Sequence, residues 1–75
     1  MSADKLVYMA NQIAKFMESK PHEEGISGLS SHINDFWEPR MRRHFFEVVD
    51  AGGADLRPLV LEAATTIRRP QPETV

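Results

Sequence analysis

Residues 3–20 have the sequence ADKLVYMANQIAKFMESK, which carries the clearest structural pattern in the chain. Its apolar side chains recur at spacings of three and four, and such spacing places them along one face of a helix. The members of this face are Leu6, Met9, Ala10, Ile13, Ala14 and Met17. Ser2 is a candidate N-cap, and Pro21 ends the segment because the residue before a proline is pushed out of the helical region. The pattern predicts an amphipathic helix over residues 3–20.

The middle of the chain shows the same period in two shorter segments separated by a proline. Residues 21–25 predict a connecting loop, and residues 26–37 predict a second helix. Proline is tolerated in the first turn of a helix, so we place a third helix over residues 39–51. One helix kinked at Pro39 is an open alternative. The pair Gly52-Gly53 ends this segment, because glycine adopts the left-handed conformation of a helix C-cap without strain.

The last periodic segment predicts a fourth helix over residues 55–68, with Asp55 as its N-cap and Pro58 in the permissive first turn. Its apolar face consists of Leu56, Leu59, Val60, Ala63, Ala64 and Ile67. No segment alternates with the period of two that marks a strand. The sequence therefore predicts an all-α fold, a small bundle of three to four short helices in one domain over residues 1–69. Residues 70–75 contain two prolines and no periodicity, which predicts a disordered tail.

Length and composition limit how such a domain is stabilised. A chain of 75 residues buries a thin core, and without cysteine it forms neither a disulfide nor a thiolate zinc site. Association with another chain is the remaining way to gain stability. The formal charge of −2 argues against a general nucleic-acid binder. Neither a signal peptide nor a membrane-spanning stretch is predicted, so we expect a cytoplasmic protein.

The sequence offers little for catalysis. The three histidines, His22, His32 and His44, lack the i, i+4 spacing that places two imidazoles on one helix face for a metal. The serines lack the glycine-flanked turn of a nucleophile, and Gly52-Gly53 lacks the spacing and the lysine of a phosphate-binding loop. We therefore predict no catalytic residue, no metal ligand and no cofactor-binding residue.

Two features indicate a surface that binds another protein. Arg40, Arg42 and Arg43 form a cluster whose planar guanidinium groups suit partner carboxylates or phosphates. The competing interpretation is a solvated helix face with weak ion pairs to nearby glutamates. Several large side chains are further candidates for this surface. Most of them lie off the apolar faces of their predicted helices, and arginine together with aromatic side chains is typical of binding hot spots. These further candidates are Tyr8, Phe46 and Leu61, with Trp37 as a buried core residue or anchor.

Three stretches resemble the delta subunit family of soluble NAD-dependent formate dehydrogenases. They are YMANQIAKF (residues 8–16), HINDFWEPRMRR (residues 32–43) and LVLEAA (residues 59–64). The resemblance implies a small subunit that accompanies a large molybdenum-containing alpha subunit, with flavin and iron–sulfur subunits completing the enzyme. It further implies that the delta subunit holds none of these cofactors and serves complex assembly, cofactor insertion or stabilisation. No catalytic residue is carried over from the family.

Two other functions stay open from the residues alone. A self-associating protein would cover the surplus apolar side chains across a symmetry axis, as a homo-oligomer of the isolated chain. A helix-turn-helix-like nucleic-acid binder would place the arginines on phosphates, against the negative charge of the chain. We expect docking onto the alpha subunit in preference to both.

Overall fold

The computed structural model describes residues 2–70, and regular structure within them is helical throughout. There are four α-helices, α1 (Ala3–Met17), α2 (His22–Phe36), α3 (Pro39–Asp50) and α4 (Pro58–Ala63), and a 3-10 turn, η1 (Ala64–Thr66), continues α4. No strand occurs in residues 2–70. The predicted all-α fold is confirmed.

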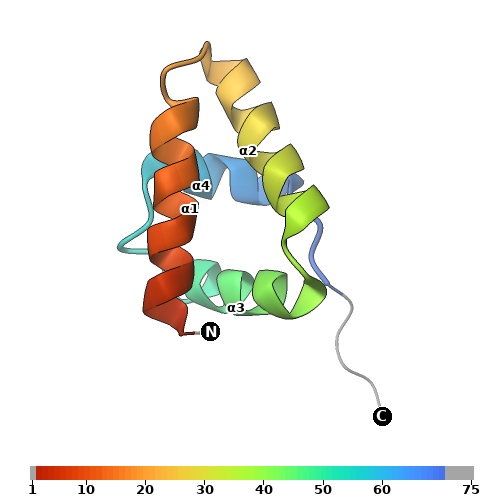
Figure 1. The fold of residues 1–75 in the computed structure, drawn as a ribbon. Helices are drawn as coiled ribbons and strands as arrows, with labels where there is room; N and C mark the ends of the chain where they lie inside the picture. Colours follow the sequence, from red (N-terminus) through yellow and green to blue (C-terminus); the bar gives the residue numbers. More distant parts are fainter. Residues whose placement is uncertain (1, 71–75) are drawn as a thin grey trace.

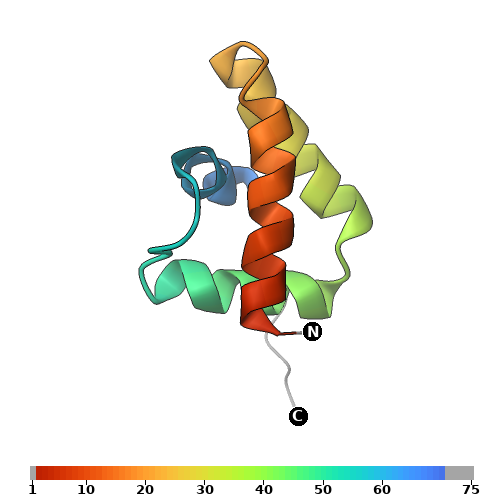
Figure 2. The same ribbon diagram turned by 60° about the vertical axis from the view of Figure 1, so that its left-hand side comes forward.

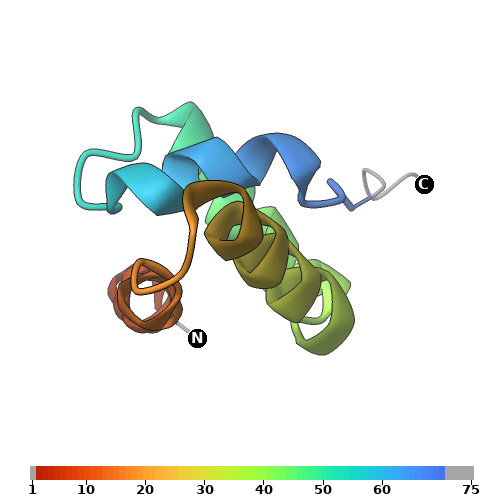
Figure 3. The ribbon, with the colours of Figure 1, turned by 90° about the horizontal axis from the view of Figure 1, so that it is seen from above.

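The helices cross one another at steep angles. α1 and α2 run in opposite directions and diverge from the short turn that joins them, so they form a V (Figure 1). α3 lies across the open end of the V and packs on α1. α4 lies behind the V and contacts both of its arms (Figure 2). Seen from above, α4 and the connection before it lie on one side of α1 and α2 (Figure 3). All four helices can therefore reach one core.

The core confirms most of the predicted apolar faces. All six predicted positions from Leu56 to Ile67 are buried, as are Leu6, Ala10 and Ala14 of α1. Met9, Ile13 and Met17 are partly buried around them. The remaining buried apolar side chains are Leu29 and Ile33 of α2, Trp37 after it, and Phe45 and Phe46 of α3. Burial of Phe46 corrects the prediction that it lies off the apolar face of its helix.

α1 begins as predicted and ends earlier than predicted. The hydroxyl oxygen of Ser2 accepts a hydrogen bond from the backbone N–H of Lys5, which confirms the N-cap. The helix stops at Met17 and not at Lys20. The Ser19 hydroxyl donates to the Phe16 carbonyl at 2.8 Å, so a side chain takes up a carbonyl of the last turn. Side-chain bonds of this kind favour helix ends over helix interiors.

α2 begins four residues before the predicted start, so the predicted loop over residues 21–25 is wrong. The carbonyl of Pro21 accepts the backbone N–H of Gly25 at 2.8 Å, which closes the first turn. Glu23 and Glu24 lie in that turn, where negative side chains favour a helix N-terminus. Gly25 is buried against α1 and does not mark a loop.

α3 is a separate helix, so the kinked-helix alternative is excluded. Trp37 and Glu38 are extended, as expected for residues that lead into a proline, and Pro39 occupies the first turn. At the other end, Gly52 and Gly53 have φ angles of +117° and +59°. Their N–H groups donate to the carbonyls of Val49 and Val48, the pattern of a Schellman cap. The predicted glycine C-cap is confirmed.

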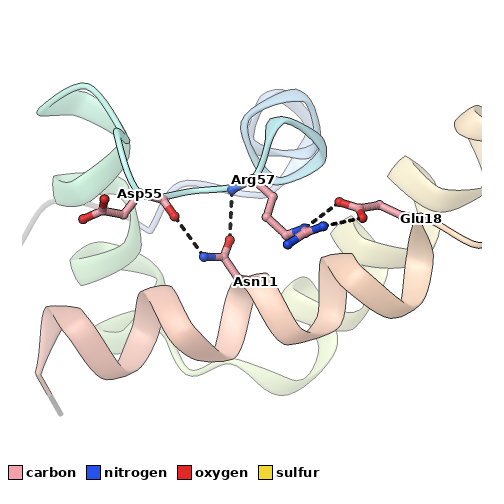
Figure 4. Close-up of polar contacts among 4 residues, drawn as sticks. All are labelled: Asn11, Glu18, Asp55 and Arg57. Carbon is pink, nitrogen blue, oxygen red and sulfur yellow. Dashed lines mark hydrogen bonds and ion pairs between the residues drawn. The ribbon is translucent and has the colours of Figure 1, made fainter.

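α4 is shorter than the predicted helix over residues 55–68, and Asp55 is not its N-cap. Figure 4 shows the reason: the Asn11 side chain of α1 binds the backbone on both sides of Leu56. Asn11 Nδ2 donates to the Asp55 carbonyl, and Asn11 Oδ1 accepts the Arg57 N–H, each at 2.9 Å. Pro58 also favours an extended Arg57. Residues 55–57 are thus held against α1, and the helix starts at Pro58.

The C-terminal end of the fourth segment is also irregular. The hydroxyls of Thr65 and Thr66 donate to the carbonyls of Glu62 and Ala63, and the chain tightens into η1 before extending at Ile67. The predicted disordered tail over residues 70–75 falls, apart from Pro70, outside the described residues.

Candidate docking surface

An arginine-lined hollow forms where the start of α3 meets the chain after η1. It has a volume of about 440 Å3 and is lined by Pro39, Arg42, Arg43, Arg68, Arg69 and Pro70. We call it the arginine hollow. Four arginine side chains therefore line one hollow on a chain whose net charge is −2.

Two of these guanidinium groups are held by backbone carbonyls. Arg42 donates from Nε to the Trp37 carbonyl at 3.3 Å and from Nη1 to the Arg68 carbonyl at 2.6 Å. Arg68 donates from Nη2 to the Asn34 carbonyl at 3.3 Å. Within residues 2–70, no carboxylate forms an ion pair with Arg42 or Arg68. Their side chains are positioned, yet their positive charge is not neutralised there.

Arg69 differs because it has a carboxylate partner and an aromatic one. Its two terminal nitrogens bind the two oxygens of Asp50 at 2.8 and 3.1 Å. The guanidinium also lies over the ring of Phe46, 4.2 Å from its centroid. The hydrogen bond from Arg69 keeps the pKa of the Asp50 carboxyl below its usual value.

A second hollow also has Arg69 in its lining. It has a volume of about 300 Å3 and is lined by Phe46, Val49, Leu61, Ala64, Thr65, Ile67 and Arg69. We call it the apolar hollow. Both hollows share Arg69, so they form one continuous surface, which we call the docking face. The docking face thus has an arginine-lined part next to a part lined mostly by apolar side chains, between α3, α4 and the chain after η1.

The comparison with known protein families agrees with the sequence resemblance. The sequence model of the family described as NADH-dependent formate dehydrogenase delta subunit FdsD matches residues 5–64. The chain belongs to this family. No curated protein and no solved structure shows significant similarity to it.

The docking face extends beyond the part of the chain that the delta-subunit family model covers. The match contains α1 from Lys5 onwards, all of α2, α3 and α4, and the first residue of η1. Arg42, Arg43, Phe46 and Leu61 lie inside it, whereas Arg68 and Arg69 follow it. The features that define the delta-subunit family therefore include only part of this face.

The structure brings four of the seven predicted partner-binding residues together. Arg42 and Arg43 line the arginine hollow, and Phe46 and Leu61 line the apolar hollow. Phe46 is 4% exposed, so it forms a wall of that hollow and does not project as an anchor. Whether any of these residues binds a partner stays a prediction.

The other three predicted residues lie elsewhere. Trp37 is 4% exposed and packs edge-on against Phe45, which places it in the core and not among exposed anchors. Tyr8 is 64% exposed on α1, where its hydroxyl oxygen accepts a hydrogen bond from Gln12. Arg40 is exposed and lines neither hollow.

Sequence reasoning missed several exposed or charged residues. The sequence places Arg68 at the end of the predicted fourth helix and Arg69 just after it, and it indicates no role for either. Their approach to Arg42 depends on the return of the chain after η1, which no local pattern indicates. Phe16 and Phe36 are exposed on α1 and α2. Phe16 lies off the apolar face of its predicted helix, so the pattern indicates its exposure. Phe36 follows Ile33 by three residues and falls on the apolar face of the second helix, so the spacing does not predict its exposure.

Two histidines lie beside glutamates at the surface. His22 lies 3.0 Å from Glu62, and His44 lies 3.6 Å from Glu47. Within residues 2–70, no three His, Asp or Glu side chains are grouped to hold a metal ion. None of the helices in that range has the length and apolar character needed to cross a membrane.

The two bidentate ion pairs predict acid sensitivity. Arg57 binds both oxygens of Glu18, at 2.7 and 2.8 Å (Figure 4). These hydrogen bonds lower the pKa of Glu18, and the hydrogen bonds from Arg69 lower the pKa of Asp50 in the same way. A carboxyl with a depressed folded-state pKa adds stability above its unfolded pKa, about 4, and loses it as the pH falls through the folded value. We therefore expect the free energy of unfolding to decrease below about pH 4.

Urea unfolding followed by circular dichroism between pH 7 and pH 2.5 measures this dependence, with ~0.5-unit steps to resolve the slope. The double variant Glu18→Gln and Asp50→Asn is the control, and its stability should vary less over the acid range. Both pairs are exposed to solvent, so the effect is small at neutral pH. An unchanged acid slope in the double variant would contradict the assignment.

Proposed function

We propose that this chain is a non-catalytic accessory subunit that binds the molybdenum-containing catalytic subunit of a formate dehydrogenase and stabilises or helps to assemble it. Membership of the delta-subunit family supports a role within such an enzyme. The docking face is the observation that carries the proposal, because it combines positioned arginines with an adjoining apolar hollow. Arginine with apolar and aromatic side chains is the composition of protein interfaces.

Binding of a small chain can stabilise a larger one without any chemistry of its own. A ligand that binds only the folded or assembled state shifts the equilibrium towards that state, by about 2.7 kcal/mol at a concentration one hundredfold above Kd. In the same way, a subunit that binds one conformation of the catalytic subunit would hold it ready for assembly or for cofactor insertion. We propose the cytoplasm as the site of this action.

A second candidate is self-association through other surfaces. Tyr8 and Phe16 lie on α1 and are each 64% exposed, and Phe36 on α2 is 72% exposed. These rings lie outside both hollows. Contact between two copies through one or more of these exposed rings would leave the docking face available for a partner.

Co-purification with the catalytic subunit tests the proposed function. We expect an affinity-tagged chain to retain the catalytic subunit when the two are co-expressed. Leu61→Asp places a carboxylate in the apolar hollow and should reduce the retained amount about tenfold, since a buried unpaired charge costs more than about 1.4 kcal/mol. Tyr8→Asp is the matched control, because it adds the same charge outside both hollows.

Three results would count against the proposal. The first is failure of the unmodified chain to retain the catalytic subunit. The second is equal retention by Leu61→Asp and the unmodified chain. In the third, Tyr8→Asp loses the partner while Leu61→Asp keeps it, which would assign binding to the surface of α1 around Tyr8. Circular dichroism of both variants verifies that they fold.

A further inference from the structure

From the charge and shape of the docking face we infer the chemistry of its partner: a short acidic segment of another protein, followed by an apolar side chain. Carboxylates of this segment occupy the arginine hollow, and the apolar side chain enters the apolar hollow. The inference rests on the proposed function, since it describes what the docking face binds. It also adds Arg68 and Arg69, which lie beyond the part of the chain matched by the family.

The first step concerns the donors that Arg42 and Arg68 leave available. Arg42 uses its Nε and one hydrogen of Nη1, and Arg68 uses one hydrogen of Nη2, all on backbone carbonyls. A guanidinium carries more N–H donors than these, in a planar arrangement that matches a carboxylate. The bonds to carbonyls restrict each side chain, which reduces the conformational entropy lost when a ligand binds.

The second step concerns charge. A partner that covers the docking face removes water from Arg42 and Arg68, and an unpaired charge is costly to desolvate. No carboxylate within residues 2–70 forms an ion pair with either group, and the nearby Asp50 is already paired with Arg69. The covering surface must therefore supply acceptors, and negatively charged ones form the strongest hydrogen bonds with guanidinium groups.

The third step uses the apolar hollow to distinguish peptide from free anion. Phosphate also binds guanidinium groups, but it has nothing to place among Phe46, Leu61 and Ile67. A peptide segment carries both kinds of side chain, and the two hollows adjoin because Arg69 lines both of them. Arg69 is held at this shared position by its stacking on Phe46 and its pairing with Asp50. The composite surface therefore favours a protein segment over a phosphate.

A peptide-binding experiment with the full chain tests this inference. The probe is fluorescein-labelled Gly-Ser-Glu-Asp-Glu-Gly-Leu-Phe-Gly-Ser, and binding is followed by fluorescence anisotropy at low ionic strength. We expect the Gln-Asn-Gln analogue to bind at least about tenfold more weakly, because hydrogen bonds to charged groups contribute about 1.5–3 kcal/mol. The analogue with serines in place of Leu-Phe should also bind about tenfold more weakly.

Variants of the chain locate the site. Arg42→Ala with Arg68→Ala should weaken binding of the acidic peptide about tenfold or more. Arg40→Ala is the control on the same helix as Arg42, since it removes one positive charge outside the hollow where the double variant removes two, and it should change the affinity less than about twofold. Arg42→Lys keeps the charge and loses the planar fork, so it should also weaken binding while preserving the fold.

The following outcomes would overturn the inference. One is equal affinity for the acidic peptide and its amide analogue, or no measurable binding of either. Another is displacement of the peptide by tripolyphosphate while the serine analogue binds as well as the original, which would mean an anion site without a peptide. A third is an equal loss of affinity in Arg40→Ala and in the double variant.

The proposed function can be separated from this inference. If the unmodified chain and the Arg42→Ala, Arg68→Ala variant retain the catalytic subunit equally and the peptide does not bind, the accessory role stands and the acidic segment is rejected. If the peptide binds as expected but the catalytic subunit is never retained, the acidic ligand stands and the proposed partner is rejected.

Discussion

Replacement of Phe45 by alanine is expected to unfold the isolated chain at neutral pH and room temperature. Phe45 is 1% exposed and is among the largest fully buried side chains. It packs edge-on against Trp37 and Phe46, with ring centroids 6.0 and 5.2 Å away. Truncation of a buried phenylalanine to alanine costs about 3–5 kcal/mol. Because a single core of this size supplies about 3–5 kcal/mol in total, the loss removes nearly all of the stability.

Circular dichroism and urea unfolding of the isolated chain measure this effect. Phe36→Ala is the matched control: it makes the same chemical change at a ring that is 72% exposed and contacts His32. We expect this control to change the free energy of unfolding by less than about 0.5 kcal/mol. A folded Phe45→Ala chain with a loss below about 1 kcal/mol would mean that α3 is not part of the stabilising core.

The same narrow margin connects stability with the proposed docking. A core of this size leaves little stability in reserve, and no disulfide is available without cysteine. Docking of the face between α3 and α4 would hold both helices in place, since each supplies residues to the apolar hollow. The accessory chain and its partner would then stabilise each other through one binding energy.

Periodic features of the sequence predicted the fold well because they reflect local chemistry. The apolar face from Leu56 to Ile67 is buried as its spacing indicates, and the Ser2 and Gly52-Gly53 caps form the expected backbone bonds. Each of these signals depends on residues within a few positions of one another. Local rules of this kind do not require knowledge of the other helices.

Errors arose where a distant residue overrides a local signal. Asp55 is a good N-cap by residue type, but Asn11, far away in the sequence, binds the backbone of Asp55 and Arg57 and holds this stretch against α1 outside the helix. Gly25 was assigned to a loop, although its missing side chain serves the contact between α2 and the Met17 carbonyl. Neither partner can be found from spacing along one segment.

The candidate docking surface shows the same division. The sequence shows the arginines of residues 40–43 as a cluster. The turn of the helix points them in different directions, and only Arg42 and Arg43 line the arginine hollow. Arg68 joins them because its carbonyl accepts from Arg42 and its guanidinium binds the Asn34 carbonyl. These bonds link α2, α3 and the chain after η1, so the site exists only in the folded chain.

The two glycines of α2 give the second large effect, because the same substitution is expected to act in opposite directions. A Cβ atom on Gly25 would lie 2.8 Å from the backbone carbonyl oxygen of Met17, which is closer than real Cβ contacts allow. A Cβ on Gly28 would lie 2.9 Å from Sδ of the same Met17, an atom in a flexible side chain. The first obstacle is fixed backbone, whereas the second can rotate away.

Gly25→Ala should therefore lower the free energy of unfolding by about 2 kcal/mol. Overpacking costs about 1–3 kcal/mol, and the added methyl group must push α1 away from α2. Gly28→Ala should be neutral or gain up to about 1 kcal/mol, because alanine favours a helix interior over glycine by that amount. Urea unfolding of the two single variants measures the difference directly. Equal effects of the two substitutions would show that α2 does not approach the end of α1 through Gly25. Other contacts would then have to hold the two helices together at the closed end of the V.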